Sequence, residues 1–456
     1  MGIFGDIVMF AWIPVVIFLF TRFEPQRAAI IAFLAAWLFL PMAKYPLPGM
    51  PDYTKMSATC FGIFLSAMIF DSQRIMAFKP RAMDIPMLIW CLCPLFSSLA
   101  NGLGFYDGIA SLLTQTVKWG FPYLIGRIYF SSLDGLGKYA VGIFAGGLIY
   151  VPLCLYESRM SPQLHHMFYG FTQSAFDQSY RYGGWRPMVF MDHGLMVGMW
   201  MISASLVGLW LYRTGALKEL RGYSMRWLVP VLTVTAIMCR STGAVALYIM
   251  GAAALLATQK LKSAVVIICL LCLPVGYLVT RSTEFWSGKN LVEFISNTLS
   301  EDRAASIDFR FKNENILAEK ALQQPVFGWG GWGRARVYDA EGNDVSVTDG
   351  LWIIVFGQYG LLGIAALTAS VLLPVIRLLR LYPARTWSTP EVAPAAALAV
   401  LLILYMIDNL LNAMINPIFM VAAGGLAGLE AQEHYAADAL ESRVPEQAEQ
   451  LKTRYI

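Results

Sequence analysis

The residues of this chain best suited to chemistry are arginines that lie between its long apolar runs. They are Arg181, Arg186, Arg240, Arg303, Arg310, Arg334 and Arg336. A guanidinium group presents a planar fork of N–H donors that matches phosphate oxygens, and it stays charged at any working pH. The set therefore suits a phosphate or pyrophosphate group, and at the edge of a bilayer it would suit a lipid-linked pyrophosphate. The alternative is that individual arginines pair with nearby carboxylates such as Glu301 or Asp308.

Four further residues are candidates for the same site. Asp349 could accept a proton from a sugar hydroxyl, or it could cap the helix that begins beside it. His193, next to Asp192, could carry a proton, or both could be polar residues inside a helix bundle. Lys118 lies within an apolar run, where a lysine is either functional or extends its ammonium group to the interface.

Three other polar segments lead to separate expectations. The turn between the last two apolar runs could line the same cavity, through Asp408, Asn409, Asn412 and Asn416. His165 and His166 lie in a loop, and we expect them to be solvated. The glycine-rich stretch at 327–333 follows a helix stop at Pro325 without a preceding strand, so it is expected to be an ordinary turn.

Several kinds of chemistry lack sequence support. The chain contains no GxxxxGK[ST] or HExxH motif, so neither a nucleotide-driven pump nor a zinc peptidase is predicted. The seven cysteines lie within or at the ends of apolar runs, which argues against a disulfide framework or a zinc site. We therefore predict no metal, no cofactor and no nucleic-acid partner.

The composition indicates the elements that must position these residues. Of the 456 residues, 57% are hydrophobic and 14% are charged, whereas soluble proteins carry roughly 25% charged residues. About thirteen apolar runs are long enough to cross a bilayer as helices. The fold class predicted is an all-α, polytopic membrane bundle of about 12–14 transmembrane helices. The first run lacks a basic flank and a cleavage site, so we expect it to be retained.

Loop charges predict which side each loop faces. Basic residues follow the odd-numbered runs, among them Arg22, Arg74, Arg127, Arg213, Lys260 and Arg377. Because positive loops stay cytoplasmic, the N-terminus is predicted outside and a polar tail, 432–456, inside. The stretch 227–257 must then be a hairpin with Arg240 at its outer tip. The bundle covers 1–431, with two long outer loops at 157–186 and 281–349. In the larger loop, the apolar residues from Ile307 to Leu322 fall largely on one face, which predicts an amphipathic helix.

The order of the motifs resembles that of the O-antigen ligase/polymerase superfamily. Asp308-Phe309-Arg310 is followed by a helix and then by Gln324-Pro325-Val326-Phe327-Gly328-Trp329-Gly330, similar to the family's loop arginine and its P-x-x-G-x-G turn. Gln358-Tyr359-Gly360-Leu361-Leu362-Gly363 is close to the E-x-G-x-x-G motif. Arg240-Ser241-Thr242-Gly243 resembles the S-R-x-G hairpin, and Arg186–His193 stands where the family has an arginine-containing segment.

The resemblance implies a GT-C-like fold and an inverting, metal-independent glycosyltransferase of the bacterial cytoplasmic membrane. Its donor would be a glycan on undecaprenyl pyrophosphate, and flippases or chain-length regulators would be further candidate partners. Arg240 and Arg310 match the family's hairpin and loop arginines, which bind the pyrophosphate. Arg181 and Arg186 are added as further pyrophosphate ligands, with Asp349 as proton acceptor and Arg334 as another candidate.

One departure from the family pattern separates the alternatives. Ligases carry a histidine followed by asparagine where this chain reads Thr348-Asp349-Gly350-Leu351. The difference favours a polymerase of lipid-linked repeat units, which builds a surface polysaccharide or exopolysaccharide, over a ligase to lipid A core. From other classes, a polysaccharide or lipid transporter and a structural subunit of an export complex remain alternatives. The absence of an internal repeat weighs against the transporter.

Overall fold

The computed structural model describes residues 2–47, 49–174, 179–181, 183–298, 301–331 and 333–430. Within these ranges the side chains at positions 295, 298, 302, 303 and 306 are not described. The predicted tail 432–456 and the side chain of Arg303 therefore lie outside the description.

Helices make up most of the described chain, and strands form only short hairpins. The helices are α1 (Ile3–Arg22), α2 (Pro25–Phe39), α3 (Lys55–Phe70), α4 (Ser72–Met76), α5 (Ile85–Ala100), α6 (Phe105–Gln115), α7 (Phe121–Tyr129), α8 (Leu133–Met160), α9 (Leu164–Tyr169), α10 (Gly194–Arg213), α11 (Met225–Met238), α12 (Thr242–Leu261), α13 (Val265–Ser282), α14 (Lys289–Thr298), α15 (Glu301–Leu322), α16 (Leu351–Leu381), α17 (Ala393–Leu411) and α18 (Pro417–Gly428). The antiparallel hairpins are β1–β2 (Lys44–Leu47, Met50–Thr54), β3–β4 (Tyr180–Arg181, Gly184–Trp185) and β5–β6 (Glu219–Leu220, Tyr223–Ser224).

The helices confirm an all-α membrane bundle. Among the described residues, 8 helices are both long enough and apolar enough to cross a bilayer. Four shorter apolar helices, α2, α3, α11 and α18, accompany them. A helix crosses lipid because all its backbone groups bond within the segment, which strands as short as β1 to β6 cannot achieve.

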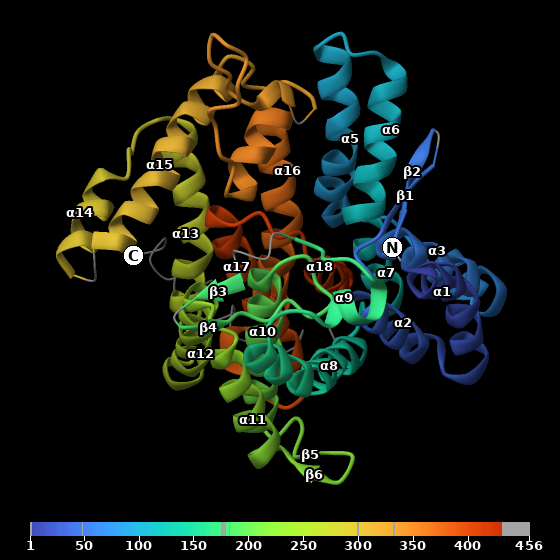
Figure 1. Cartoon of the computed structure of the whole chain (residues 1–456). Helices are drawn as coiled ribbons and strands as arrows, with labels where there is room; N and C mark the ends of the chain where they lie inside the picture. Colours follow the sequence, from blue (N-terminus) through green and yellow to red (C-terminus); the bar gives the residue numbers. More distant parts are fainter. Residues whose placement is uncertain are drawn as a thin grey trace, which may run out of the picture.

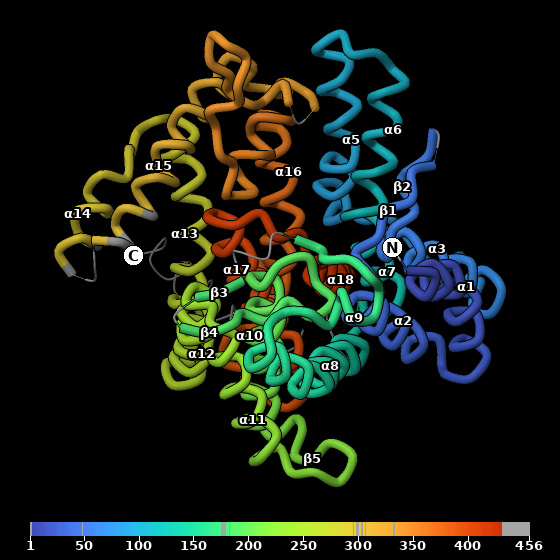
Figure 2. Tube along the Cα trace, viewed as in Figure 1, coloured from blue at the N-terminus to red at the C-terminus, as the bar shows by residue number. Residues whose placement is uncertain are grey.

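Three helices, α10, α17 and α18, lie at the centre of the bundle, and every residue of α18 is buried. In α10 and α17, 89% and 83% of the apolar window is buried by protein, whereas in α1 only 22% is buried. Figure 1 shows α17 and α18 running behind α10, with α5 and α6 forming a projecting pair. The same trace in Figure 2 places α14 and α15 at the margin beside α13. The central helices are therefore shielded from lipid by the others.

Three local features bear on the predicted outer face. The helix is broken at Cys239–Ser241, between α11 and α12, as the predicted hairpin at Arg240 requires. The amphipathic helix predicted from Ile307 begins earlier, at Glu301, and ends at Leu322 as predicted. The first predicted outer loop begins later than residue 157, because α8 continues to Met160.

Candidate functional site

Arg310, on the loop helix α15, meets Asp349, which lies two residues before α16 begins. The Nε atom of Arg310 lies 3.5 Å from Oδ2 of Asp349, and the two side chains are 30% and 36% exposed. Another guanidinium nitrogen donates to the carbonyl of Leu411 at 3.1 Å. The distance is long for an ion pair and both side chains are partly exposed, so a ligand can reach both charges.

Asp349 does not cap α16. The cap position is Gly350, and no side chain accepts a hydrogen bond from the first turn. The helix-cap alternative for Asp349 is therefore wrong in this structure, and its carboxylate faces Arg310 instead.

The turn between α17 and α18 forms the other side of this junction. The backbone N–H of Leu351 donates to the carbonyl of Asn412 at 3.0 Å, and the Asn412 amide donates to Oδ1 of Asp408 at 2.8 Å. A Cβ atom at Gly350 would lie 2.4 Å from the Leu410 carbonyl oxygen, so only glycine allows this approach. Asp408 interacts electrostatically with Arg310. Arg310 therefore faces two carboxylates from different elements.

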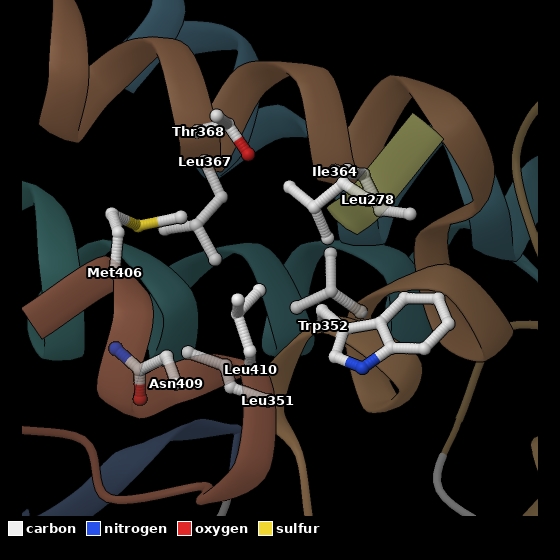
Figure 3. Close-up of a pocket in the computed structure, with 10 residues that line it drawn as sticks. Leu278, Leu351, Trp352, Ile364, Leu367, Thr368, Met406, Asn409 and Leu410 are labelled. Atoms are coloured by element: carbon white, nitrogen blue, oxygen red, sulfur yellow. The ribbon is translucent and has the colours of Figure 1, made fainter. Parts of the chain in front are cut away.

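The rest of the polar turn does not join the junction. The side chain of Asn416 caps α18 by accepting from the N–H of Ile418 at 3.2 Å. Asn409 lines a small apolar cavity together with Trp352 and Met406, as Figure 3 shows. That cavity measures about 20 Å³, room for about one water molecule. It is too small for a sugar or a phosphate, so the substrate side of the junction is the exposed one.

A buried ion pair fixes the helix that carries Arg310. Arg281 and Glu314 are each 3% exposed, and their closest atoms are 3.0 Å apart. Glu314 also accepts from the hydroxyl of Tyr277 at 2.7 Å and from the indole N–H of Trp352 at 3.1 Å. Because Glu314 lies one helical turn beyond Arg310, this cluster sets the position of Arg310 against α13 and α16. Neither residue of this pair was among the candidates predicted from the sequence.

The glycine-rich segment after α15 is not an ordinary turn, because it inserts into a break in α16. Gly360 interrupts α16 with φ 66° and ψ −160°. Across the break, the N–H of Leu361 donates to the Pro325 carbonyl at 2.8 Å. In the opposite direction, the N–H of Trp329 donates to the Gly357 carbonyl at 2.8 Å.

Two glycines make this insertion sterically possible. A Cβ at Gly328 would lie 2.4 Å from the backbone of Gln358, and one at Gly360 would lie 2.4 Å from the Val326 carbonyl oxygen. The α5 side chain Ser97 donates to the Gln358 carbonyl at 2.8 Å. The backbone groups freed by the break are thus satisfied by the chain itself, as a membrane protein requires.

A second group of arginines surrounds the turn between α11 and α12. Arg186 is 3% exposed and donates to the carbonyl of Arg240 at 3.2 Å. Arg240, with φ 53°, donates to the carbonyl of Arg181 at 3.3 Å. Arg186 is thus buried and holds the turn, whereas Arg181 lies exposed and Arg240 is partly exposed. The sequence predicted Arg186 as a direct phosphate ligand. Because Arg186 is buried, it is less suited to that role than Arg240.

Arg240 opens onto a pocket of about 640 Å³. Arg159, at the end of α8, also lines the pocket, as does the aromatic pair Tyr180 and Trp185, whose ring centroids lie 5.0 Å apart. Two guanidinium groups beside aromatic rings can bind phosphate oxygens and stack on the apolar faces of sugars. Arg159 was not identified from the sequence, where it lies at the end of an apolar run.

The remaining candidates lie in separate places. His193 caps α10 through Nδ1, which accepts from the N–H of Leu195 at 3.1 Å. Burial, with the charges of Arg186 and Arg181, lowers the pKa of His193 to about 4, so it is a weak base at neutral pH. Burial raises the pKa of Asp192, against the opposing charge of Lys55.

Lys118 and Arg334 are directed elsewhere. The electrostatic neighbours of Lys118 are Lys44 and Asp52, on the β1–β2 hairpin. Arg334 is exposed, and its Nε donates to the carbonyl of Trp329 at 3.0 Å. His165 contradicts its expected solvation, because it is 1% exposed and accepts from the N–H of Met42 at 3.1 Å.

No protein-family model matches this chain, and no curated protein does so either.

Proposed function

We propose that this protein is a membrane glycosyltransferase that polymerises oligosaccharide repeat units linked to undecaprenyl pyrophosphate. The observation that carries the proposal is the junction of Arg310 with Asp349, where a guanidinium suited to phosphate lies 3.5 Å from a carboxylate that could accept a proton. Both residues are partly exposed, and the cluster around Glu314 holds the helix that carries Arg310. The resemblance of the motifs to the O-antigen ligase/polymerase superfamily supplies the substrate class.

In the proposed reaction, a hydroxyl of the acceptor repeat unit attacks the anomeric carbon of the donor sugar. Asp349 accepts the hydroxyl proton as the new glycosidic bond forms. The bond between the anomeric carbon and the pyrophosphate oxygen breaks, and undecaprenyl pyrophosphate leaves. Arg310 exchanges Asp349 for the pyrophosphate and stabilises the charge that develops on the leaving group. Release of the carboxylate from Arg310 at that moment would make Asp349 a better base.

The donor would also contact the second arginine group. Arg240 and Arg159 offer two cations on a pocket large enough for a pyrophosphate or a sugar residue. Arg181 would contribute from the rim, and Arg186 would hold the turn in position. We propose that the site lies on the outer face of the bacterial cytoplasmic membrane, in a GT-C-like arrangement with the N-terminus outside, because the positive loops then face the cytoplasm.

Two observations favour a polymerase over the alternatives. Asp349 stands where a ligase has a histidine, and its carboxylate pairs with Arg310 rather than capping the helix. Broken helices in transporters leave carbonyl groups free for an ion. In α16 the break is filled by residues 325–330, which occupy those groups.

The test is an assay of purified protein in liposomes that contain lipid-linked repeat units. We expect glycans longer than one repeat to form without added nucleotide. Arg310→Ala should abolish the longer products. Lys312→Ala, which removes an exposed cation two positions along the same helix, is the matched control and should leave them unchanged. Transfer to lipid A core without chain extension would show a ligase, and absence of both products with wild-type protein would refute the proposal.

A further inference from the structure

A second basic pocket lies at the opposite end of α16 from Asp349. The 31 residues of α16 correspond to about 46 Å of helix, and Arg377 lies near its C-terminal end. Beside it, residues at or near the ends of α4, α7 and α18 line a pocket of about 380 Å³. Four cationic side chains line the pocket: Arg74, Lys79, Arg81 and Arg127. By the loop charges, this is the cytoplasmic face, so the pocket is separate from the proposed reaction site.

The cations of this pocket differ in how firmly they are held. Arg127 is 5% exposed at its side chain and is fixed by Asp84, with Nε 2.7 Å from Oδ1 and a second nitrogen 3.0 Å from Oδ2. Arg74 pairs with Asp71 at 3.0 Å and remains 39% exposed. Lys79 lies exposed at the rim. The inner arginine is therefore structural, whereas the outer cations can be reached by a ligand.

Glu430 already places a carboxylate against this cluster. Its side chain is 69% exposed and pairs with Arg81, which is 36% exposed. Arg81 also donates to the carbonyl of Gly428 at 3.1 Å, and Arg377 donates to the carbonyl of Leu429 at 2.9 Å. Arg377 is near enough to Arg81 and Arg127 to be repelled by their charges. The described cluster holds five cations, with Arg377, against the three carboxylates of Asp71, Asp84 and Glu430, so it keeps a positive excess.

The walls of the pocket are apolar on one side. Phe78 and Ile128 line it beside the cations, and the guanidinium of Arg127 lies 5.2 Å from the centre of the Phe78 ring. An apolar wall next to exposed cations, at the end of membrane helices, matches a ligand with a phosphate and an acyl-glycerol part. Basic pockets between helix ends on the cytoplasmic side bind the head groups of anionic lipids in this manner.

We infer that this pocket binds the phosphate head group of an anionic phospholipid, which competes with the carboxylate of Glu430 for Arg81. The lipid phosphate would contact Lys79 and Arg81, and the glycerol and first acyl carbons would lie along Phe78 and Ile128. Removal of the Glu430 charge should tighten binding, because the site then loses its internal competitor. Loss of the two outer cations should weaken it.

The inference is tested by native mass spectrometry of the purified full chain with phosphatidylglycerol, with phosphatidylcholine and with inorganic phosphate. Each cation near a lipid head group contributes about fivefold in affinity, so Lys79→Ala with Arg81→Ala should weaken phosphatidylglycerol binding about twenty-five-fold. Glu430→Gln should bind more tightly than wild type. The matched control is Lys218→Ala with Arg226→Ala, which removes two cations of another predicted cytoplasmic loop and should leave the affinity unchanged.

Several results would overturn the inference. An equal loss of phosphatidylglycerol affinity in the control variant would show that the lipid is attracted by the overall positive charge of this face rather than bound at one site. Equal binding of phosphatidylcholine would show that the phosphate of an anionic head group is not what is recognised. Inorganic phosphate bound as tightly as phosphatidylglycerol would identify a free anion as the ligand. A Glu430→Gln protein with wild-type affinity would remove the proposed competition.

Discussion

Substitution of Gly360 by alanine tests the contact between the loop and α16. At this position φ is 66° and ψ is −160°, a combination that is essentially restricted to glycine. The added Cβ would also lie 2.4 Å from the carbonyl oxygen of Val326. That oxygen belongs to backbone, so it cannot move without displacing the inserted segment.

The expected cost follows from these two effects. A residue held in this backbone region costs about 1–3 kcal/mol. Displacement of the inserted segment breaks the bonds from Leu361 and Leu362 to the carbonyls of Pro325 and Val326, at about 0.5–1.5 kcal/mol each. We therefore expect Gly360→Ala to lower the free energy of unfolding by about 2–6 kcal/mol.

The measurement is denaturant unfolding in detergent, combined with limited proteolysis of residues 325–330. Gly276→Ala is the matched control, because Gly276 also lies in an apolar helix and a Cβ there would meet no atom within 4 Å. Gly360→Ala should unfold at lower denaturant and expose the loop to protease, whereas Gly276→Ala should do neither. If the two variants are equally stable, the reasoning about the insertion is wrong.

Three further predictions follow from the site. Glu314→Gln leaves Arg281 buried without its charge partner, and should lower the free energy of unfolding by about 3–5 kcal/mol in the same assay. A decrease no larger than that caused by Lys312→Ala would contradict this prediction. His193 has a pKa of about 4 when folded and an ordinary value of 6.5. Since only the unfolded chain is then protonated between these values, stability should fall as pH drops from 6.5 towards 4, and His193→Gln should remove that part of the pH dependence. A Cβ at Gly184 would lie 2.3 Å from the guanidinium of Arg240, at the far end of a flexible side chain. Gly184→Ala should therefore displace the guanidinium, raise the KM for the lipid-linked donor and leave the free energy of unfolding unchanged. An unaltered KM would exclude Arg240 from donor binding.

The sequence predicts the membrane bundle because hydropathy is a local property. Each helix satisfies its own backbone, so its apolar run is visible without any knowledge of its neighbours. The break near Arg240 was predictable because the two flanking loops are both basic and must share one side. The helix at 307–322 was predictable from its apolar spacing, although its first turn, from Glu301, was not.

Contacts between distant segments were not predictable in the same way. Nothing local shows that positions 328 and 360 must both be glycine. The requirement appears only where the two segments approach each other, because a Cβ at either position would meet the backbone of the other segment. The pairing of Arg281 with Glu314 is hidden for a similar reason, since a basic residue at the end of an apolar run normally faces the interface. His165 was misjudged because its burial depends on contacts with segments distant in the sequence, such as the bond from Met42, which lies between α2 and β1.

The candidate site was predictable in its residue types but not in its grouping. The charges of the loops predicted that the arginines lie on one face of the membrane. The sequence could not show that Arg310 would meet Asp349, or that Arg186 would be buried beneath the Arg240 turn. The choice between a cap and a reactive carboxylate for Asp349 depends on a single hydrogen bond, which only the structure resolves.

The most direct test of the account is the rate at which purified wild-type and Asp349→Asn proteins release undecaprenyl pyrophosphate from a saturating lipid-linked donor with its acceptor. Asparagine keeps the size of the side chain but cannot accept the proton. We expect kcat to fall by about 10²–10⁴-fold, the usual contribution of a general base, with little change in the KM for the donor. Asp349→Asn protein that turns over at the wild-type rate would contradict the assignment of the reaction to this junction.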